Sequence, residues 1–350
     1  MLNGKPLIGI SVGDLNGIGL EVIMKAFEPA EMLDFCTPVI FASSKVVSYH
    51  RKALGMDKFN FQVIHAMDKV LANKINLFNC WKEEVVLELG QENKEVGKYA
   101  FKSLDAACEN LENNVIDALV TAPIHKAAIQ SDDFKFAGHT DYLESRFKGK
   151  ATMMLISEEM RMALATVHIP LANVASALST ELILKKIKDI GHTLKKDFHI
   201  PKGRIAVLAL NPHAGDHGLI GDEDDRIVAP AIQQALDNGV MAFGPYPADS
   251  FFGSGNHKNF DAILAMYHDQ GLIPFKSMSF GQGVNYSSGL TITRTSPDHG
   301  TGFDIAGKGI ANESSFREAV LLACDLVQRR AITQEIERRP LKINRGKKDD

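Results

Sequence analysis

The chain has 350 residues, of which 45% are hydrophobic and 23% are charged, and its formal net charge is −4. This composition is typical of a globular protein, and a chain of this length usually forms more than one lobe. The interspersed charges exclude the basic surface of a nucleic-acid-binding protein, and no apolar run approaches the roughly 18 residues of a membrane span.

The cysteines and the N-terminal segment indicate a cellular compartment. Cys36, Cys80, Cys108 and Cys324 lie far apart without CxxC spacing, which excludes a zinc ribbon and a disulfide scaffold. The apolar run near the N-terminus is too short for a signal peptide. We therefore expect a reduced, cytoplasmic protein, with the basic segment 341–350 as a solvated tail.

Short apolar segments alternate with helical patterns along the chain. Strands are predicted at 7–12, 38–42, 61–65, 116–121, 151–156, 161–167, 204–210, 261–267 and 288–294. Helices are predicted at 97–113, 180–197, 224–238 and 314–337, with Asp222 as the cap of the third. Several strands are almost entirely apolar, as expected where both faces of a sheet are covered. The alternation predicts an α/β fold.

Polar and glycine-rich segments follow six of these strands. They are GDLNGIG (13–19), TAPIHK (121–126), HIP (168–170), NPHAGDHG (211–218), YHDQG (267–271) and TRTSPDHGTG (293–302). Ligands of α/β proteins bind beyond the carboxyl ends of strands. The sequence therefore predicts a ligand site built from these segments.

Three histidines, His168, His213 and His268, lie at or near predicted strand ends. Three neutral imidazoles with one open position can form a catalytic metal site. Asp249 and Asp269 could orient these imidazoles from behind. Three unrelated histidines with local hydrogen bonds fit the spacing as well, so both interpretations stay open on the residues alone.

Several cations lie in predicted loops beside glycine, threonine or proline: Lys126, His139, Lys276 and Arg294. A phosphate or carboxylate substrate would need such donors, although ordinary surface charge is the alternative. The GDLNGIG segment predicts a turn that opens a helix, but it is not a GxGxxG fingerprint. The sequence also has no P-loop and no GxSxG elbow.

Taken together, nine segments resemble the 4-hydroxythreonine-4-phosphate dehydrogenase family over about residues 7–330. They are GDLNGIGLE, TAPIHK, GHTDYL, VHIPL, LNPHAGDHGLIGDED, GPYPADSFF, YHDQGLIPFK, VNYSSGL and RTSPDHGT with DIAGKG. The resemblance implies a two-lobed α/β/α fold like that of isocitrate and isopropylmalate dehydrogenases. The first lobe would hold residues 1–135 and 290–350, and the second, 136–289, would carry the metal and dimer contacts.

The resemblance also implies a reaction. The family oxidises 4-phosphohydroxy-L-threonine with NAD and a divalent metal, and the product loses CO2 to give 3-amino-2-oxopropyl phosphate. NADP is a possible replacement for NAD, and zinc, magnesium or cobalt could be the metal. The enzyme would be a homodimer, with its active site in the interlobe cleft at the subunit interface.

Site residues carry over by matching motifs. The metal ligands would be His168, His213 and His268, drawn from both subunits, and the substrate contacts would be His139, Thr140, Lys276, Asn285 and Arg294. Asp249 would lie near the metal, and Asp269 would orient His268. The resemblance identifies no nicotinamide-binding residue.

Departures from the family pattern leave the substrate open. Leu15, Asn16 and Leu20 stand where proline, alanine and proline are usual, and Asp141 stands where glutamate is common. A related phosphorylated hydroxy acid, threonate or erythronate 4-phosphate, is the alternative substrate. A metal-dependent hydrolase or aldolase would use the same histidines without NAD, and a non-catalytic binding protein would not need the three histidines.

Overall fold

The computed structural model describes residues 1–339, so the predicted tail at 341–350 lies outside the described residues. Within this range the strands form one 12-stranded sheet, ordered β3-β4-β2-β1-β5-β12-β11-β6-β7-β10-β8-β9. The strands are β1 (Leu7–Ser11), β2 (Thr37–Ala42), β3 (Gln62–Ile64), β4 (Asn76–Asn79), β5 (Ala118–Thr121), β6 (Gly149–Ile156), β7 (Arg161–Leu164), β8 (Ile205–Leu208), β9 (Ala242–Tyr246), β10 (Ala262–Ala265), β11 (Val284–Leu290) and β12 (Arg294–Pro297).

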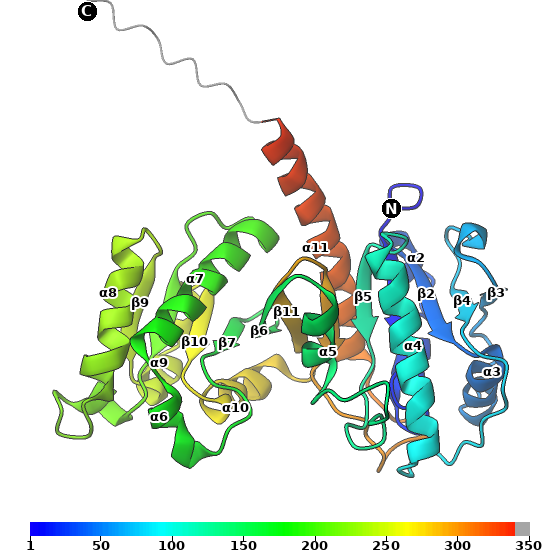
Figure 1. Ribbon diagram of the computed structural model, residues 1–350, viewed down its shortest axis with the longest axis horizontal. Coiled ribbons are helices and arrows are strands. Elements are labelled where there is room, and N and C mark those ends of the chain that lie inside the picture. The colour runs from blue at the N-terminus through cyan, green and yellow to red at the C-terminus, as the bar shows by residue number, and fades with distance from the viewer. Residues whose placement is uncertain (340–350) are drawn as a thin grey trace, which may run out of the picture.

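Helices lie on both faces of this sheet (Figure 1). They are α1 (Gly19–Ala26), α2 (Met32–Phe35), α3 (Ser44–Ala53), α4 (Lys94–Glu112), α5 (His139–Arg146), α6 (Val174–Ala177), α7 (Thr180–Asp197), α8 (Ala229–Asp237), α9 (Ala248–Gly253), α10 (His268–Ser279) and α11 (Ser314–Arg338). Short 3-10 turns lie at Met67–Lys69, Leu171–Asn173, Pro212–Gly215 and Asn256–Asn259, and a π turn at Asp224–Val228 precedes α8.

The sheet is parallel in its two outer parts and antiparallel in its middle. β11 runs antiparallel to both of its neighbours, β12 and β6, and β6 also runs antiparallel to β7. Figure 1 shows β2, β3 and β4 at one end of the molecule, α8 and β9 at the other, and α11 between them. The antiparallel strands therefore join two parallel α/β units.

Both faces of the strands are buried, which explains their nearly continuous apolar sequences. In β2, Val39 and Phe41 pack in the core that α4 covers, whereas Ile40 packs in the core that contains α1 and α11. Successive side chains of a strand point to opposite faces, so each face of β2 needs its own apolar set. The α/β class predicted from the sequence is confirmed.

Most predicted elements are found close to their expected bounds. The helix predicted at 180–197 is α7 (Thr180–Asp197), and the helix predicted at 314–337 is α11. Two short strands at the sheet periphery, β4 and β9, were not predicted. The predicted Asp222 cap is wrong, because the helical segment begins at Asp224 after Glu223, without a side-chain cap.

The strand predicted at 288–294 is wrong as a single element. β11 ends at Leu290 and β12 begins at Arg294, and the two strands pair antiparallel. Thr291, Ile292 and Thr293 continue the β-branched pattern through the connection, so the sequence gives no sign of the turn. Arg294 consequently begins a new strand instead of ending an old one.

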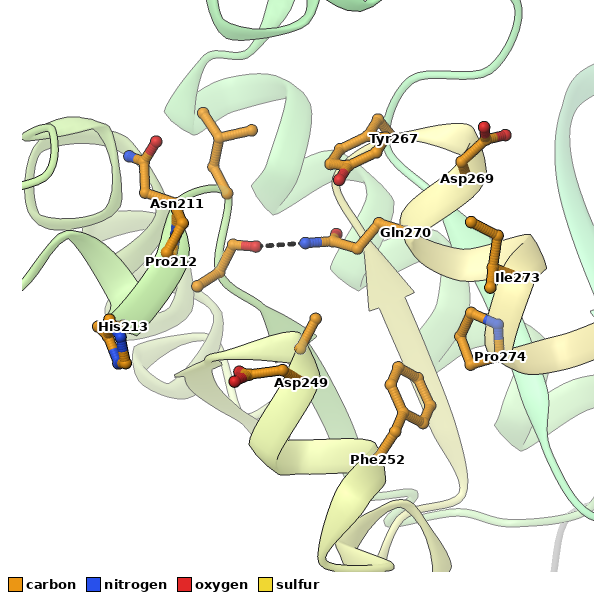
Figure 2. Close-up of a pocket in the computed structure, with 13 residues that line it drawn as sticks. Asn211, Pro212, His213, Asp249, Phe252, Tyr267, Asp269, Gln270, Ile273 and Pro274 are labelled. Atoms are coloured by element: carbon orange, nitrogen blue, oxygen red, sulfur yellow. Dashed lines mark hydrogen bonds between the residues drawn. The ribbon is translucent and has the colours of Figure 1, made fainter. Parts of the chain in front are cut away.

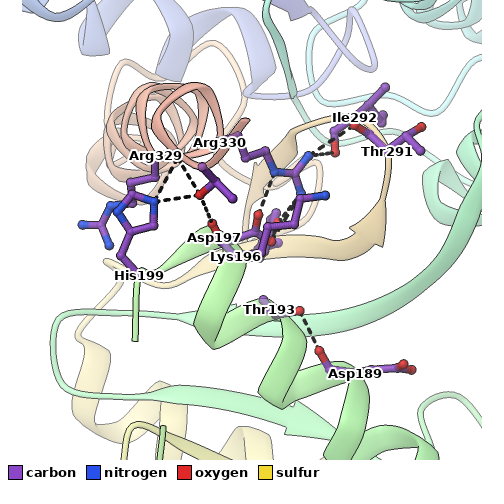
Figure 3. Close-up of polar contacts among 11 residues, drawn as sticks. Asp189, Thr193, Lys196, Asp197, His199, Thr291, Ile292, Arg329 and Arg330 are labelled. Atoms are coloured by element: carbon purple, nitrogen blue, oxygen red, sulfur yellow. Dashed lines mark hydrogen bonds and ion pairs between the residues drawn. The ribbon is translucent and has the colours of Figure 1, made fainter. Parts of the chain in front are cut away.

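A buried polar network connects α7, β11 and α11 (Figure 3). Arg330 Nε donates to Asp197 Oδ1 at 2.7 Å, and the Tyr286 hydroxyl donates to Asp197 Oδ2 at 2.6 Å. Arg330 also donates to the Ile292 carbonyl at 2.8 Å. Because each member has a charged or hydroxyl partner, the network satisfies groups that would otherwise be costly to bury.

The described part of the chain contains no helix long and apolar enough to cross a membrane. The division into lobes at 1–135 plus 290–350 and 136–289 stays a prediction.

Candidate active site

A cavity of about 540 Å³ lies on one face of the central strands. It is lined by the predicted site residues His139, Thr140, His168, His268, Lys276, Asn285 and Arg294. These residues come from α5, the segment after β7, both ends of α10, β11 and β12. Residues separated by up to 155 positions in the sequence, from His139 to Arg294, therefore line one space, as the strand-end pattern predicts.

Arg294 is the buried cation of this cavity, with only 3% of its surface exposed. Its Nη2 donates to the Thr121 hydroxyl at 2.6 Å, and its Nη1 donates to the Ser287 hydroxyl at 3.1 Å. Among residues 1–339 no carboxylate lies within 4.0 Å of it. Burial lowers the pKa of Arg294 to about 10, which leaves the guanidinium charged at neutral pH. The cavity therefore contains a buried positive charge that an anionic ligand would neutralise.

His139 is the first residue of α5 and lies near two cations, Arg294 and Lys126. Its Nε2 is buried and has no hydrogen-bond partner in the described residues. Burial holds the pKa of His139 well below its usual value, and the charges of Arg294 and Lys126 lower it further. The imidazole is therefore neutral at pH 7 and can offer a hydrogen bond to a ligand without adding charge.

His168 and His268 lie together in the same cavity. Their ring centroids are 5.8 Å apart, and the Nδ1 of His268 is 2.7 Å from Asp269 Oδ1. Burial, Lys126 and His268 lower the pKa of His168, which favours the neutral form that binds metals. A carboxylate on Nδ1 of His268 fixes the tautomer and leaves Nε2 with a free lone pair.

Gly271 allows this close approach of α10 to the sheet. A Cβ atom at Gly271 would lie 2.7 Å from Leu164 Cδ2 and 3.1 Å from the Cβ of Ala265. Leu164 belongs to β7 and Ala265 to β10, so α10 packs directly against both strands. The glycine of the YHDQG segment thus places His268 beside the end of β7, where His168 follows.

His213 does not join the other two histidines. It lines a second cavity of about 580 Å³ with Asp249, Tyr267 and Asp269 (Figure 2). Gln270 fixes this region, because its side-chain amide donates to the Ala209 carbonyl at 2.6 Å. In residues 1–339 no group of three potential ligands is placed to hold a metal ion.

The loop that carries His213 has an unusual backbone. Every residue from His213 to Gly218 has a positive φ, including Ala214, Asp216 and His217. Non-glycine residues adopt this region at a cost, and such strain is concentrated at functional sites. The imidazole of His213 is exposed, so the loop presents it to the outside of this chain.

The cavity also contains polar residues that the sequence did not single out. They are Lys186 of α7 and Asp298 of the segment after β12; Asp141 of α5, the aspartate at a position where the family commonly has glutamate, also lines the cavity. Lys126, which the sequence suggested as a cation, lines it too. Lys186 carries no sequence signal, because a lysine in an amphipathic helix normally lies on the solvated face.

Family comparison assigns the chain. The model of the family "Pyridoxal phosphate biosynthetic protein PdxA" matches residues 34–323. The chain is 46% identical over its full length to a 4-hydroxythreonine-4-phosphate dehydrogenase of Bacteroides thetaiotaomicron, covering 96% of that protein. It is 35% identical to an Oceanobacillus iheyensis protein with the provisional name D-threonate 4-phosphate dehydrogenase, covering 93% of this chain and 99% of that one.

A solved structure gives the same answer. The 4-hydroxythreonine-4-phosphate dehydrogenase of Klebsiella pneumoniae matches the fold with a TM-score of 0.80 at 31% identity, covering 94% of this chain and 100% of that chain. The family predicted from the sequence motifs is thereby confirmed. The chain belongs to the PdxA family of pyridoxal phosphate biosynthetic proteins.

Proposed function

We propose that this protein oxidises 4-phosphohydroxy-L-threonine with NAD and a divalent metal, and that the product loses CO2 to give 3-amino-2-oxopropyl phosphate. The observation that carries the proposal is one cavity with two neighbouring imidazoles, His168 and His268, and a buried arginine that has no carboxylate partner among residues 1–339. The relatives named for this activity support the substrate. We further propose that the enzyme works in the cytoplasm.

The cations of the cavity suit a phosphorylated, acidic substrate. Arg294 offers a rigid guanidinium held by two hydroxyl groups, and Lys276 and Lys126 add ammonium groups. His139 and Thr140 are the first residues of α5, where backbone N–H groups also favour an anion. Binding the remote phosphate would position the reacting carbon without taking part in the chemistry.

The donor set fits a divalent metal only in part within one chain. His168 and His268 would supply two imidazole ligands, and the free Nε2 of His268 is available because Asp269 contacts Nδ1. His213 would supply the third ligand from a second copy of the chain. A bound Zn²⁺, Mg²⁺ or Co²⁺ ion would act there as a Lewis acid toward the substrate hydroxyl and the developing negative charge.

Exposed apolar side chains support the homodimer. Leu219 is 80% exposed, and Ile273 and Phe280 of α10 and its end are 64% and 84% exposed. Ile273 lines the same cavity as His213, and Leu219 follows the loop that carries His213. Burial of these side chains against a second copy would remove apolar surface from water and bring His213 to the partner's cavity.

The proposed cleft uses both predicted lobes. Thr121 and Arg294 belong to the first lobe, and His168, His268 and Lys276 belong to the second. Asp249, in the cavity with His213, is a candidate to accept the proton of the substrate hydroxyl across the subunit interface.

An assay with two substrates tests the reaction. The protein is mixed with a divalent metal and NAD, or NADP in parallel, and NADH and CO2 are followed with 4-phosphohydroxy-L-threonine. Formation of both products is expected, and EDTA should stop it. The relative provisionally named D-threonate 4-phosphate dehydrogenase favours threonate 4-phosphate as second candidate, with erythronate 4-phosphate as a further comparison. Turnover of threonate or erythronate 4-phosphate without turnover of 4-phosphohydroxy-L-threonine would assign that compound as the substrate instead.

A further inference from the structure

Lys186 is a half-buried lysine of α7 that lines the cavity together with residues carried by α5 and α10. Its neighbours on α7, Ile183 and Ile187, are fully buried in the core beneath the helix. Burial lowers the pKa of Lys186 from its usual value. The ammonium group of a lysine in such a place loses part of its hydration, and no structural interaction evidently compensates for that loss.

The two faces of β6 have different partners. α7 packs on the face of β6 that carries Met154, whereas Ala151, Met153 and Leu155 line the cavity from the other face. β7 pairs with β6 only from Met154 to Ile156. Residues 149–153 of β6 therefore have no partner in β7, and Lys186 lines the cavity although its helix packs on the other face of β6.

The carboxylates closest to Lys186 are engaged elsewhere. Asp189 accepts from the Thr152 hydroxyl at 3.3 Å and lies 3.7 Å from Lys185. Glu144 accepts from the backbone N–H of Ala151 at 2.6 Å and pairs with Lys150 at 3.2 Å. No carboxylate in residues 1–339 lies within 4.0 Å of the Lys186 ammonium. Lys186 thus joins Arg294, Lys126 and Lys276 as a cavity cation without a carboxylate partner among residues 1–339.

We propose that Lys186 binds the phosphate group of the substrate together with Arg294. A phosphate monoester carries close to two negative charges at neutral pH and needs more than one cation, so Lys186 would act beside Arg294 and the cavity lysines Lys126 and Lys276. Both cations line one cavity, and neither is paired within the described chain. This inference rests on the proposed function for the identity of the substrate, but not for the presence of a phosphate site.

Phosphate binding tests the inference without NAD, metal or turnover. Inorganic phosphate is titrated into the full-length protein by calorimetry, for the wild type, Lys186→Met and Lys188→Met. Lys188 is the matched control, because it lies on the same helix, is exposed and does not line the cavity. We expect Lys186→Met to weaken phosphate binding about tenfold or more, and Lys188→Met to change it less than about twofold.

Steady-state kinetics then shows whether Lys186 binds the phosphate of the substrate or the phosphates of NAD. With the active enzyme, Lys186→Met should raise the KM of the phosphorylated substrate about tenfold with kcat within about threefold, because remote binding is lost. Lys186→Arg should restore much of the affinity. A higher KM for NAD with an unchanged KM for the substrate would assign Lys186 to the cofactor phosphates and overturn the inference.

Other outcomes of these experiments also decide whether Lys186 binds the substrate phosphate. Equal phosphate affinity of the wild type and Lys186→Met, or no phosphate binding by the wild type, contradicts the assignment. Phosphate binding that depends on Lys186 in a protein that oxidises none of the substrates would leave the inference standing and remove the dehydrogenase proposal. Lys186→Gln answers the same question if the methionine variant does not fold.

Discussion

Arg294 illustrates how a residue can be placed for binding at the expense of stability. Its guanidinium is nearly inaccessible, and within residues 1–339 its only hydrogen-bond partners are the hydroxyls of Thr121 and Ser287. Buried charges are normally paired, because removing an ion from water costs several kcal/mol. A neutral hydroxyl orients the guanidinium but does not neutralise it, so the compensating charge has to come from a ligand.

Replacing Arg294 by Met should therefore separate stability from activity. We expect the free energy of unfolding to stay within about 1 kcal/mol of the wild type, or to rise, because an unpaired buried charge is removed. The kcat/KM for the phosphorylated substrate should fall at least about 100-fold. Urea unfolding and steady-state kinetics measure the two effects. A large loss of stability in this variant would contradict the view that Arg294 is unpaired in the free protein.

His50 gives a prediction for pH. It is 2% exposed, its Nε2–H donates to the Leu15 carbonyl at 2.8 Å, and burial lowers its pKa from 6.5 to about 4. The unfolded chain binds this proton near pH 6.5 and the folded chain only near pH 4. The contribution of His50 to stability is therefore present above pH 6.5 and is lost as the pH falls toward 4.

The expected loss over this interval is up to about 3 kcal/mol in the free energy of unfolding. Urea unfolding at a series of pH values measures it. His50→Gln keeps a donor for the Leu15 carbonyl but cannot titrate, so the slope of stability against pH should decrease by about one proton in this variant. An unchanged slope would show that His50 is not the group responsible.

At the scale of elements, α7 and α11 are joined by charge as well as by apolar contacts. Asp197, Tyr286 and Arg330 are all buried, and the carboxylate accepts from both partners (Figure 3). Tyr286 faces this network, while its neighbour Asn285 lines the cavity on the other face of β11. The network therefore stabilises the strand that carries a predicted substrate contact.

Removing one partner of this network should be costly. Arg330→Met leaves Asp197 buried without its cation, and we expect the free energy of unfolding to fall by about 3–5 kcal/mol. Lys98→Met is the comparison, since Lys98 and Glu95 form an exposed pair at 2.9 Å whose loss should change stability much less. Urea denaturation compares the two variants. Similar small effects in both would mean that the buried network does not stabilise the fold.

The sequence predicts elements well where periodicity is strong. The bounds of α7 follow from its apolar spacing and from Ser179, whose hydroxyl accepts from the Leu182 N–H. The turn between β11 and β12 was missed because threonine and isoleucine fill it, and those residues favour strands. Hydrophobic periodicity and strand propensity indicate which residues can be buried, but they do not indicate where the chain reverses direction.

The site shows a similar limit. Motifs placed His139, His168, His268 and Arg294 in one cavity, and the structure brings these side chains together. Lys186 carries no such signal, because it belongs to an ordinary amphipathic helix and lines the cavity only where distant elements of the fold come together. Positions that depend on how distant strands pair cannot be read from local sequence.

At the scale of the whole molecule, the separation of His213 from the other histidines makes a prediction about shared sites. If His168 and His268 come from one chain and His213 from another, mixed dimers of His213→Ala and His268→Ala should contain one intact site. We expect about half of the wild-type activity per dimer of this composition, where each parent variant is inactive. Co-expression with two affinity tags isolates the mixed dimers for assay and for metal analysis.

Mixed dimers of His168→Ala and His268→Ala are the control. Each site would lack one of the two histidines supplied by the same chain, so no activity should return. Recovery in this control, or failure in the first combination, would require a different distribution of the histidines between subunits.

The position of Arg294 between β5 and β11 has a mechanical consequence. Its guanidinium reaches Thr121 at the end of β5 on one side and Ser287 of β11 on the other, across β12, to which Arg294 itself belongs. A side chain held by residues of two flanking strands has little freedom to move. An anion bound to Arg294 would therefore be anchored at a fixed point of the sheet, from which the rest of the substrate could extend toward the histidines that follow β7 and β10.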